Sequence, residues 1–489
     1  MLKHILLYFG LALFFTTLSK ANEKPNILFI FADDQCFETI REMGLTDIET
    51  PNLDRLMKRG TTFTHTYNMG SWSGAVCVAS RHMLNTGAFL WNAEKISQSL
   101  GGGKQKPKGK GQPENQAAPN FVEKGWMWSQ LMHDAGYTTY FTGKWHVRAK
   151  PEDIFDVVKN VRGGMPNQVP EGYNRPIEGK PDPWSPYDPK WEGFWKGGKH
   201  WSEVVGDDGV DFINQAKSKD DPFFMYLAFN APHDPRQSPK EFVDKYPLDR
   251  IEIPSNFMPE YPFKDDIDNR PGLRDERLAP FPRTEYAVKV NRQEYYAIIT
   301  HMDVEIGRIL EALDASGKAD NTWIFFSADH GLAVGHHGLM GKQNLFDHSM
   351  QVPFIVAAPG VAAGKRIDSP IYLQDVMPTT LELAGAEIPD HVQFKSILPI
   401  LEGESDGYES VYGGYLKSQR CIIRGGYKLL LYPNVPKILM FNTNDDPDEL
   451  VDVHKENKPL AREMFRDFLK LQEQTGDTLD LKSTFPELL

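Results

Sequence analysis

The stretch Asn26–Asp34 reads NILFIFADD, an unbroken apolar run that ends on two adjacent carboxylates. A continuous apolar run of this length is typical of a strand that is buried on both faces, as in a parallel sheet. Three further runs also end on residue types that chemistry needs: 138–141 before Lys144 and His146, 223–229 before Pro232-His233, and 322–328 before Asp329-His330. Ligands of open parallel sheets bind beyond the carboxyl ends of the strands, so the four runs predict one shared site.

Helical patterns alternate with these apolar runs. Apolar residues recur at helical spacing between Ile298 and Ile309 and predict a helix over 294–315, and 121–135 is a second, shorter candidate. We also expect a helix directly after Cys77, which would place this residue at a helix N-terminus, where backbone amides favour negative charge. The alternation of strands and helices predicts an α/β fold.

The chain has 489 residues, enough for a large α/β domain and a smaller second one. Its pattern changes after about Glu402, because 408–432 reads as short antiparallel strands and 458–474 as a closing helix. We therefore predict three units. They are a signal peptide over 1–21, a catalytic domain over 22–402 and a small C-terminal α+β subdomain with an antiparallel sheet over 403–489.

The N-terminus has the features of a secretory signal. Lys3 is followed by an apolar run over 5–18 and then by the small-x-small sequence Ser19-Lys20-Ala21. The run is shorter than the roughly 20 residues that span a bilayer, which favours cleavage over a membrane anchor. We expect an exported protein, periplasmic or secreted, without an anchor after cleavage.

The formal net charge of −13 argues against non-specific binding to nucleic acid. An anionic substrate would therefore have to be held by a local positive site. The three cysteines, Cys36, Cys77 and Cys421, are too few for a disulfide framework. We expect Cys36 and Cys421 to be buried free thiols, and a bond between them is the alternative.

Cys77 opens the pattern Cys77-Val78-Ala79-Ser80-Arg81, which by itself is too short to be specific. It gains meaning from the other motifs of the chain: Asp33-Asp34, Gly143-Lys144-Trp145-His146, Pro232-His233, Asp329-His330-Gly331 and Gly341-Lys342. In this order, and over almost the whole mature chain, they resemble the type I (formylglycine-dependent) sulfatases of the alkaline phosphatase-like superfamily, and bacterial carbohydrate sulfatases in particular. The resemblance implies a large, mostly parallel mixed sheet flanked by helices, and hydrolysis of sulfate esters.

The resemblance also implies a metal site. Its protein ligands would be Asp33, Asp34, Asp329 and His330, with the modified Cys77 and the substrate completing the coordination sphere. Three carboxylates at strand ends would repel one another unless a cation neutralised them. Oxygen-rich ligation favours Ca²⁺ or Mg²⁺, and the extracellular supply of calcium favours Ca²⁺. His330 departs from the pattern, because many relatives have Asn here; hydrogen bonding to the bound ester is its alternative role.

In this family the cysteine, here Cys77, is oxidised to formylglycine. One oxygen of the aldehyde hydrate attacks sulfur and displaces the alcohol, which leaves a sulfated enzyme. The remaining hydroxyl then loses its proton, sulfate is expelled and the aldehyde is regenerated, so that one difficult step becomes two easier ones. Arg81 and Lys144 would hold the hydrate, and His146 would be the base that breaks down the sulfated intermediate. The six catalytic positions implied are Cys77, Arg81, Lys144, His146, His233 and Lys342.

His233 and Lys342 would flank the ester. His233 is the better general acid for the leaving alcohol, since the pKa of histidine lies near working pH. Lys342 and the metal would stabilise charge on the transferred group.

Two stretches depart from the family's pattern. Ala79 stands where the motif usually has proline, and alanine is accepted by the anaerobic radical-type maturation system more readily than by the oxygen-dependent one. An anaerobic-type maturase is therefore the expected partner. Further on, Phe346, Asp347 and Gln351 stand where relatives have tyrosine, glutamate and arginine. We interpret these as changes in the scaffold, and an altered pocket wall is the alternative.

The substrate expected from the resemblance is a sulfated carbohydrate, such as an oligosaccharide of an algal polysaccharide or of a host glycan. Candidates for sugar contacts are Trp72, Arg148, Asp234, Arg236, His336, His337 and His348. The Lys/Gly-rich insertion 100–118 is either a solvated loop or a flap that contacts a polyanion. Two other functions remain open: a phosphodiesterase or phosphonate monoester hydrolase of the same superfamily, and a catalytically silent glycan-binding protein.

Overall fold

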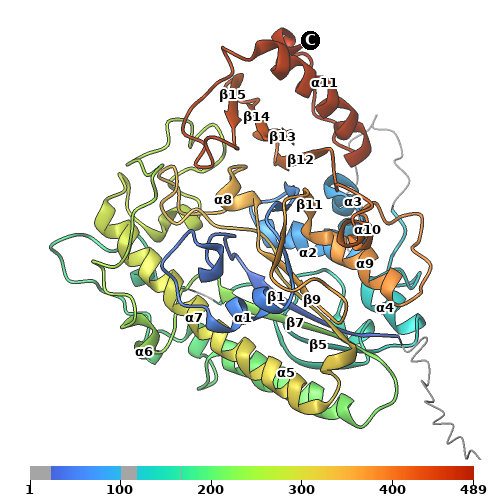
Figure 1. Ribbon diagram of the computed structural model, residues 1–489. Helices are drawn as coiled ribbons and strands as arrows, with labels where there is room; N and C mark the ends of the chain where they lie inside the picture. Colours follow the sequence, from blue (N-terminus) through green and yellow to red (C-terminus); the bar gives the residue numbers. More distant parts are fainter. Residues whose placement is uncertain (1–23, 101–117, 167) are drawn as a thin grey trace, which may run out of the picture.

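The computed structural model describes residues 24–100, 118–166 and 168–489. Its largest sheet has eight strands (Figure 1), in the order β10 (Lys365–Ile367), β2 (Thr61–Phe63), β9 (Phe354–Ala357), β8 (Thr322–Ala328), β1 (Asn26–Asp33), β7 (Phe223–Pro232), β5 (Thr138–Lys144) and β6 (Val157–Arg162). β9 is antiparallel to both of its neighbours, and the other neighbouring pairs are parallel. The predicted α/β class with a mostly parallel mixed sheet is confirmed.

The four apolar runs of the sequence are four adjacent strands at the centre of this sheet. β1 and β7 are buried along their whole length, as expected for strands covered on both faces. β1 pairs with β7 on one side and β8 on the other, so that Ile27 lies opposite both Phe224 and Trp323. The shared register brings the carboxyl ends of the strands to one edge.

Helices cover both faces of the sheet (Figure 1). One face carries α1 (Pro51–Arg59), α5 (Trp201–Lys217) and α7 (Glu285–Ser316), with α6 (Lys240–Val243) against α7. The other carries α2 (Val76–Thr86), α4 (Trp128–Asp134) and α9 (Val376–Leu383), with α3 (Leu90–Leu100) beside α2 and α10 (Leu398–Glu402) beyond α9. The helix expected after Cys77 is confirmed as α2.

Two predicted helix boundaries are wrong. α7 begins at Glu285 instead of 294, because the Thr284 side chain accepts a hydrogen bond from the Ala287 N–H at 3.1 Å and caps the helix earlier. The 121–135 segment is helical only over α4. Gly125 adopts φ 71° after a single turn, a left-handed conformation that interrupts the helix.

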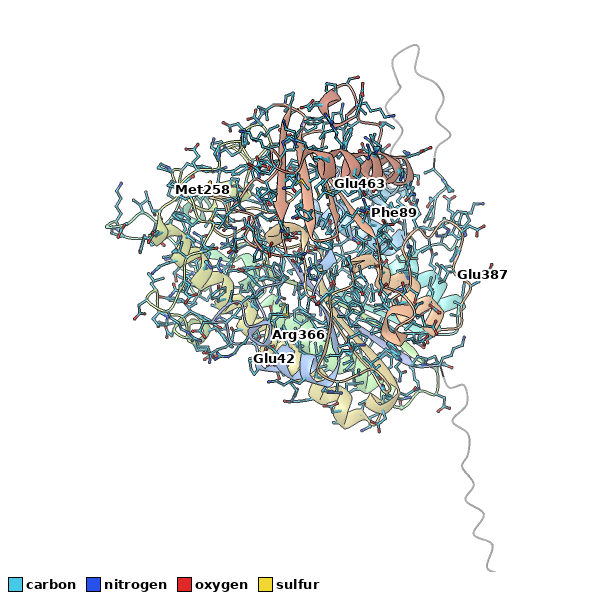
Figure 2. All side chains as sticks on the ribbon, turned by 45° about the horizontal axis from the view of Figure 1, so that its top comes forward. Glu42, Phe89, Met258, Arg366, Glu387 and Glu463 are labelled. Atoms are coloured by element: carbon cyan, nitrogen blue, oxygen red, sulfur yellow. The ribbon has the colours of Figure 1, made fainter. Side chains whose placement is uncertain are left out.

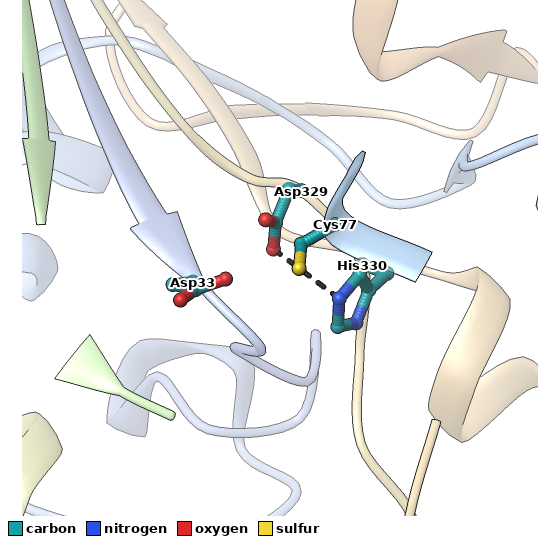
Figure 3. Close-up of side chains that lie close together, drawn as sticks. All are labelled: Asp33, Cys77, Asp329 and His330. Carbon is teal, nitrogen blue, oxygen red and sulfur yellow. Dashed lines mark ion pairs between the residues drawn. The ribbon is translucent and has the colours of Figure 1, made fainter. Parts of the chain in front are cut away.

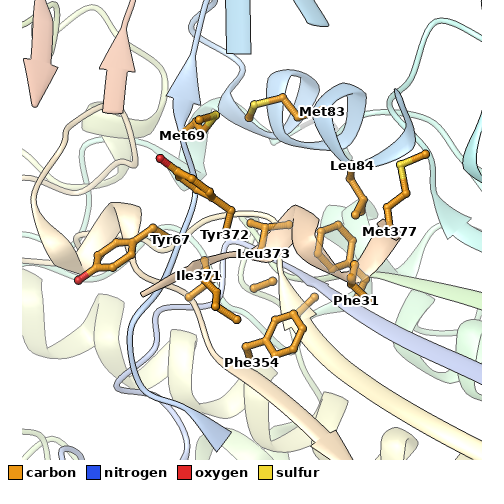
Figure 4. Packing of buried hydrophobic residues seen from close by; sticks show 14 of the residues in the cluster. Phe31, Tyr67, Met69, Met83, Leu84, Phe354, Ile371, Tyr372, Leu373 and Met377 are labelled. Atoms are coloured by element: carbon orange, nitrogen blue, oxygen red, sulfur yellow. The ribbon is translucent and has the colours of Figure 1, made fainter. Parts of the chain in front are cut away.

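Aromatic and aliphatic side chains fill the layer between the sheet and α2. Met83 and Leu84 on α2, Phe31 on β1 and Met377 on α9 all contribute side chains to this layer (Figure 4). On the same face, Trp128 packs against Phe29 and Phe224, at centroid distances of 5.3 and 4.7 Å. Burying one such side chain contributes about 1.5–3 kcal/mol, so this layer fixes α2 firmly over the strands.

A second sheet forms the C-terminal part. β12 (Ser410–Tyr415), β13 (Gln419–Arg424), β14 (Tyr427–Tyr432) and β15 (Lys437–Asn442) are antiparallel, and α11 (Lys458–Thr475) packs against them. Figure 2 shows Glu463 on α11, whose carboxylate lies 2.7 Å from the Arg424 guanidinium on β13. The predicted antiparallel strands and closing helix are confirmed.

The C-terminal sheet also contains a strand from the N-terminal half. β4 (Gly70–Ser71) joins it parallel to β12. A Cβ on Gly70 would lie 2.1 Å from the carbonyl oxygen of Gly414, and its φ is 96°, so only glycine fits this approach. A smaller ladder joins β3 (Thr66–Tyr67) to β11 (Ile371–Tyr372). The segment that leads into α2 is thus held by the C-terminal sheet and by this small ladder.

The expected signal peptide 1–21 and most of the 100–118 insertion lie outside the described residues. Within the described ranges, none of the helices combines the length and the apolar character needed to cross a bilayer. Cys36, Cys77 and Cys421 are all buried free thiols, which confirms the expectation for Cys36 and Cys421.

Candidate active site

The polar residues that follow the four central strands meet at the carboxyl edge of the sheet. Asp33 ends β1, Lys144 ends β5, His233 follows β7 and Asp329 follows β8. All four side chains are buried, with exposures of 0–1%. The backbone turns sharply at this edge, since Asp34 has φ 70°. The structure therefore brings the sequence-predicted residues of the four strands to one place.

Cys77 is the second residue of α2, and its thiol points into the same place. Its Sγ lies 3.2 Å from His146 Nδ1. Figure 3 shows Cys77 between Asp329 and His330, with Asp33 facing them from β1. One candidate ligand atom from each of these four residues lies within 4.8 Å of the other three, and Asp33, Asp34 and His233 form an overlapping group.

Three cationic side chains lie among the carboxylates. Arg81, one turn after Cys77 on α2, donates from Nε to Asp329 at 3.0 Å, and its Nη2 lies 3.6 Å from Asp33. Lys144 pairs with the other oxygen of Asp33. Lys342 donates to Asp34 Oδ2 at 2.6 Å. Each carboxylate of the site has a cationic partner within the protein.

These pairs change the electrostatic argument for a metal. The sequence suggested that three carboxylates would need an external cation, but Arg81, Lys144 and Lys342 already supply three positive charges. Charge balance alone is therefore no reason to expect a metal here. The state of the carboxyls is uneven: burial and the nearby Asp329 raise the pKa of Asp33 well above its usual value. Burial also opposes ionisation of Asp34, but His233 and Lys342 hold its pKa well below its usual value.

Unpartnered ligand atoms are the better sign of a metal site. Asp33 Oδ1, Asp34 Oδ1 and His330 Nε2 are buried, and none makes a geometrically acceptable hydrogen bond among the described residues. His330 Nε2 nevertheless lies 2.9 Å from Asp34 Oδ1 and 3.6 Å from Asp329 Oδ1. Buried polar atoms normally find partners. Asp33 Oδ1 and Asp34 Oδ1, which lack an acceptable hydrogen bond at this buried edge, fit a cation as their partner.

The thiol of Cys77 lies in a strongly electropositive environment. Burial by itself would raise the pKa of the thiol, but Lys144 and Lys342 outweigh this effect and hold it well below the usual value. Burial would likewise lower the pKa of His330, yet the carboxylates of Asp34 and Asp329 raise it to about 10. A negatively charged group at position 77 is therefore stabilised from several sides.

His233 and Lys342 lie together on the other side of Asp34. Lys342 Nζ is 2.7 Å from His233 Nε2, and both side chains are buried. The opposite ring nitrogen, Nδ1, lies 2.7 Å from a carboxylate oxygen of Asp234. A carboxylate at Nδ1 fixes the ring and leaves Nε2 facing Lys342.

Several of the expected sugar contacts have other roles. His336 interacts with Glu38 and Asn256, His337 stacks on Phe346 at 3.9 Å, and His348 stacks on His336 at 5.0 Å. These three imidazoles are 3–6% exposed, so they belong to the interior.

The other candidates for sugar contacts differ in exposure. Arg236 is also buried and donates to Asn291 at 2.8 Å. The carboxylate of Asp234 is paired with His233 Nδ1. Trp72 is half-buried and Arg148 is exposed, so these two of the seven candidates remain available to a sugar.

Sequence reasoning missed Arg274 and Asp275. Arg274 pairs with Asp234 and with Asp275, and its Nη2 lies 3.4 Å from His233 Nε2. Asp275 Oδ2 lies 3.9 Å from Lys342 Nζ. Both residues lie at the start of a short 3-10 turn on an irregular segment, where no strand end or periodic pattern marks them.

The departures at 346–353 are used by the scaffold. Phe346 provides the ring on which His337 stacks. Asp347, at the start of α8 (Asp347–Met350), lies 2.5 Å from Lys428 Nζ on β14. Gln351 donates to the Thr64 carbonyl. These contacts agree with the interpretation that the changes are structural.

Comparisons with known proteins agree with the resemblance that the motifs indicate. A family model described as sulfatase matches residues 25–386, and a second, described as the C-terminal part of N-sulphoglucosamine sulphohydrolase, matches 335–474. A sulfatase of Formosa agariphila is 26% identical over 95% of this chain and 90% of its own length. An N-acetylglucosamine-6-O-sulfatase of Bacteroides thetaiotaomicron is 23% identical over 93% and 86%, respectively.

Solved structures share the fold. A protein solved in complex with its substrate D-glucosamine-2-N,6-O-disulfate has a TM-score of 0.69 and 22% identity, over 93% of this chain and 99% of that one. A phosphonate monoester hydrolase of Silicibacter pomeroyi has a TM-score of 0.67 and 18% identity, over 94% and 97%. The family match covers most of the chain and includes every strand of the central sheet. The chain belongs to the sulfatase family and is a sulfuric ester hydrolase.

Proposed function

We propose that the protein is an exported sulfatase that hydrolyses sulfate monoesters on carbohydrates through a formylglycine made from Cys77. The observation that carries this proposal is the position of Cys77 at the N-terminus of α2, where its side chain meets His146, His330 and the carboxylates in one buried site. The sugar class is supported by relatives named for sulfated sugars, such as the N-acetylglucosamine-6-O-sulfatase. A sulfated polysaccharide, for example an algal one, would supply such oligosaccharides.

The proposed metal is Ca²⁺, with Mg²⁺ as the less favoured ion. Asp33, Asp34, Asp329 and His330 would hold it, and the unpartnered atoms of this group support the assignment. The bound cation would supply positive charge to the sulfate oxygens, and the hydrated aldehyde at position 77 would supply the attacking oxygen.

The residues around position 77 have distinct roles in this proposal. Arg81 is fixed by Asp329 and by the Lys144 carbonyl at 2.8 Å, so its charge is held rigidly beneath the helix N-terminus. Lys144, also buried, lies at the opposite side of Asp33 and would contact the hydrate. His146 Nδ1 is already within 3.2 Å of the position-77 side chain and is placed to remove its proton.

The leaving alcohol would depart on the side of His233 and Lys342. His233 Nε2 would donate the proton to the ester oxygen, since Asp234 holds the opposite ring nitrogen. Lys342 lies 2.7 Å from that Nε2 and 2.6 Å from Asp34, so its ammonium stays beside the charge that develops on the transferred group.

The first test combines peptide mass with substrate turnover. Protein made beside an anaerobic-type maturase should give a Cys77 peptide whose mass shows the thiol replaced by an aldehyde oxygen. The same protein should release sulfate from sulfated sugars and leave phosphodiesters and phosphonate monoesters nearly untouched. A preference for the phosphorus esters would favour the phosphonate hydrolase alternative, and an unmodified, inactive protein would favour the glycan-binding one.

Export is tested on the intact gene product. The proposal expects mature protein in the periplasm or medium, with an N-terminus near Asn22. Full-length protein retained in the cytoplasm would contradict it.

Removing divalent cations should destabilise and inactivate the protein. Ligand that binds only the folded state at 100 times its Kd contributes about 2.7 kcal/mol, so chelation should lower the Tm and added Ca²⁺ should restore it. The Asp33→Asn variant should lose most of this response, whereas Asp445→Asn, on an exposed turn, should keep it. A Tm and an activity that ignore both chelator and Ca²⁺ would contradict the metal assignment.

A further inference from the structure

Arg274 lies at the edge of the proposed leaving-group site and has no part in the chemistry described so far. It directly precedes the short 3-10 turn Asp275–Leu278, and its Nη2 lies 3.4 Å from His233 Nε2. Its guanidinium is therefore directly beside the ring that would protonate the leaving alcohol.

Two buried carboxylates fix the guanidinium. Arg274 donates from Nε and Nη2 to Asp275 Oδ1 at 3.0 and 2.6 Å. Its Nη2 and Nη1 both lie 3.2 Å from Asp234 oxygens. Burial would lower the pKa of Arg274, but these carboxylates raise it, so the group remains charged. A guanidinium has five N–H donors, and these contacts leave an Nη1 edge for another acceptor.

Exposure separates Arg274 from its neighbours. Its side chain is 36% exposed, whereas those of His233, Lys342, Asp234 and Asp275 are 1–5% exposed. Among these described charged groups, Arg274 is the one that solvent, and hence the bulk of a substrate, can reach directly.

Gln343 places Arg274 on the same rim as the turn before α2. Its Nε2 donates to Asp275 Oδ2 at 2.6 Å and to the Gly74 carbonyl at 3.0 Å. Gly74 and Ala75 are exposed and directly precede the buried Val76 and Cys77. Arg274 and the turn at 73–75 are thus linked through the side chains of Asp275 and Gln343, on the solvent side of the buried site.

The local charge indicates what Arg274 binds. Its single positive charge is already matched by Asp234 and Asp275, and Lys342 is matched by Asp34. A second anionic substituent would lie beside the carboxylates of Asp234 and Asp275 as well as the guanidinium, whereas a neutral oxygen would meet a well-oriented donor. The arrangement favours a hydroxyl over a carboxylate or a second sulfate.

Building on the proposed sulfatase function, we propose that Arg274 donates a hydrogen bond to a hydroxyl of the sulfated sugar, next to the ester oxygen, and so selects sugar sulfates over simple aryl sulfates. The residue acts in substrate specificity, and its two carboxylates preorganise it for that bond.

The test compares two substrates in the wild type, in two variants of Arg274 and in one control variant. The probes are 4-nitrophenyl sulfate, which has no hydroxyl, and the monosaccharide O-sulfate that the wild type cleaves fastest among the 2-, 3-, 4- and 6-sulfates. In Arg274→Gln and Arg274→Lys, the ratio of kcat/KM for sugar sulfate to that for aryl sulfate should fall roughly 10- to 100-fold, the size expected for one hydrogen bond from a charged donor. Lysine keeps the charge beside Asp234 and Asp275 but lacks the forked geometry, so it guards against misfolding.

Arg277→Gln is the matched control, because Arg277 lies in the same turn but stacks on Tyr173 at 4.6 Å. It should leave the ratio unchanged. If the wild type is active and both Arg274 variants keep its ratio of kcat/KM values, the assignment of Arg274 is overturned and the sulfatase proposal stands. Equal losses on both substrates would overturn the assignment as well, since Arg274 would then act through His233. A matured wild type that cleaves neither probe would overturn the sulfatase proposal together with this one.

Discussion

Cys77→Ala is expected to abolish sulfate-ester hydrolysis and to leave the fold intact. The side chain at position 77 is the proposed source of the attacking oxygen, and alanine offers no atom that can be oxidised to an aldehyde. Loss of a nucleophile typically costs roughly 10⁴-fold or more in kcat. The loss should appear in sulfate release from a sugar sulfate, while the far-UV spectrum and the Tm stay close to those of the wild type.

Cys421→Ala is the matched control. Cys421 is also buried, on β13 in the C-terminal sheet, where burial raises the pKa of its thiol. The control should retain the aldehyde mass at position 77 and most of the activity. Full activity in Cys77→Ala, or in wild type whose Cys77 peptide keeps the thiol mass, would contradict the proposed nucleophile.

Lys428→Met should cause the largest loss of stability. The Lys428 side chain is fully buried on β14, with Nζ 2.5 Å from Asp347, 2.6 Å from Glu449 and 3.2 Å from the Leu345 carbonyl. Removing it leaves two buried carboxylates without a cation, which typically lowers the free energy of unfolding by about 3–5 kcal/mol. Denaturant unfolding should show this loss at neutral pH. Lys470→Met, at an exposed pair with Asp467, should stay within about 0.5 kcal/mol.

The pH dependence of Lys428→Met distinguishes lost charge pairing from lost packing. In the wild type, burial raises the pKa of Glu449 from 4.5 to about 7, although Lys428 opposes the shift. A carboxyl with a raised folded pKa destabilises the fold as pH rises from about 4.5 through 7, because the unfolded chain releases its proton first. Without Lys428 this penalty grows, so the variant should lose more stability at pH 8 than at pH 5. Glu449→Gln added to Lys428→Met should restore part of it, and a loss independent of pH would indicate packing alone.

Much of the central sheet could be predicted because its signals are local. Each apolar run, such as Asn26–Ala32, predicts a buried strand by itself, and the polar residue that follows predicts where the strand ends. The short strands β2 and β10 have three residues and no such pattern, and they form only because the sheet offers them a strand to pair with. β9 is apolar, but its four residues are too few to mark a strand by themselves. The same holds for β4, whose two residues pair with a strand more than 300 positions away.

The candidate site could be predicted where residues follow strands, and not where they lie on irregular segments. Arg274 and Asp275 reach the site because a 3-10 turn folds back beside His233, which no spacing in the sequence reveals. For the histidines at 336, 337 and 348, the sequence predicted sugar contacts that the structure does not support. Histidines in a sequence are natural candidates for a functional site. Here, however, His336 interacts with Glu38 and Asn256 and His337 stacks on Phe346, all in the interior.

The sequence by itself determined the α/β class, the ends of the central strands and the group of residues that meet there, because burial and strand termination are properties of short segments. Tertiary structure decided the partners of that group. Arg81, Lys144 and Lys342 pair with the site's own carboxylates, so the site has no excess negative charge that would require a cation. The sign of a cation is instead the set of buried ligand atoms without a hydrogen-bond partner. Pairing depends on distances of a few ångströms between residues that are hundreds of positions apart, and Coulomb energies change steeply over such distances.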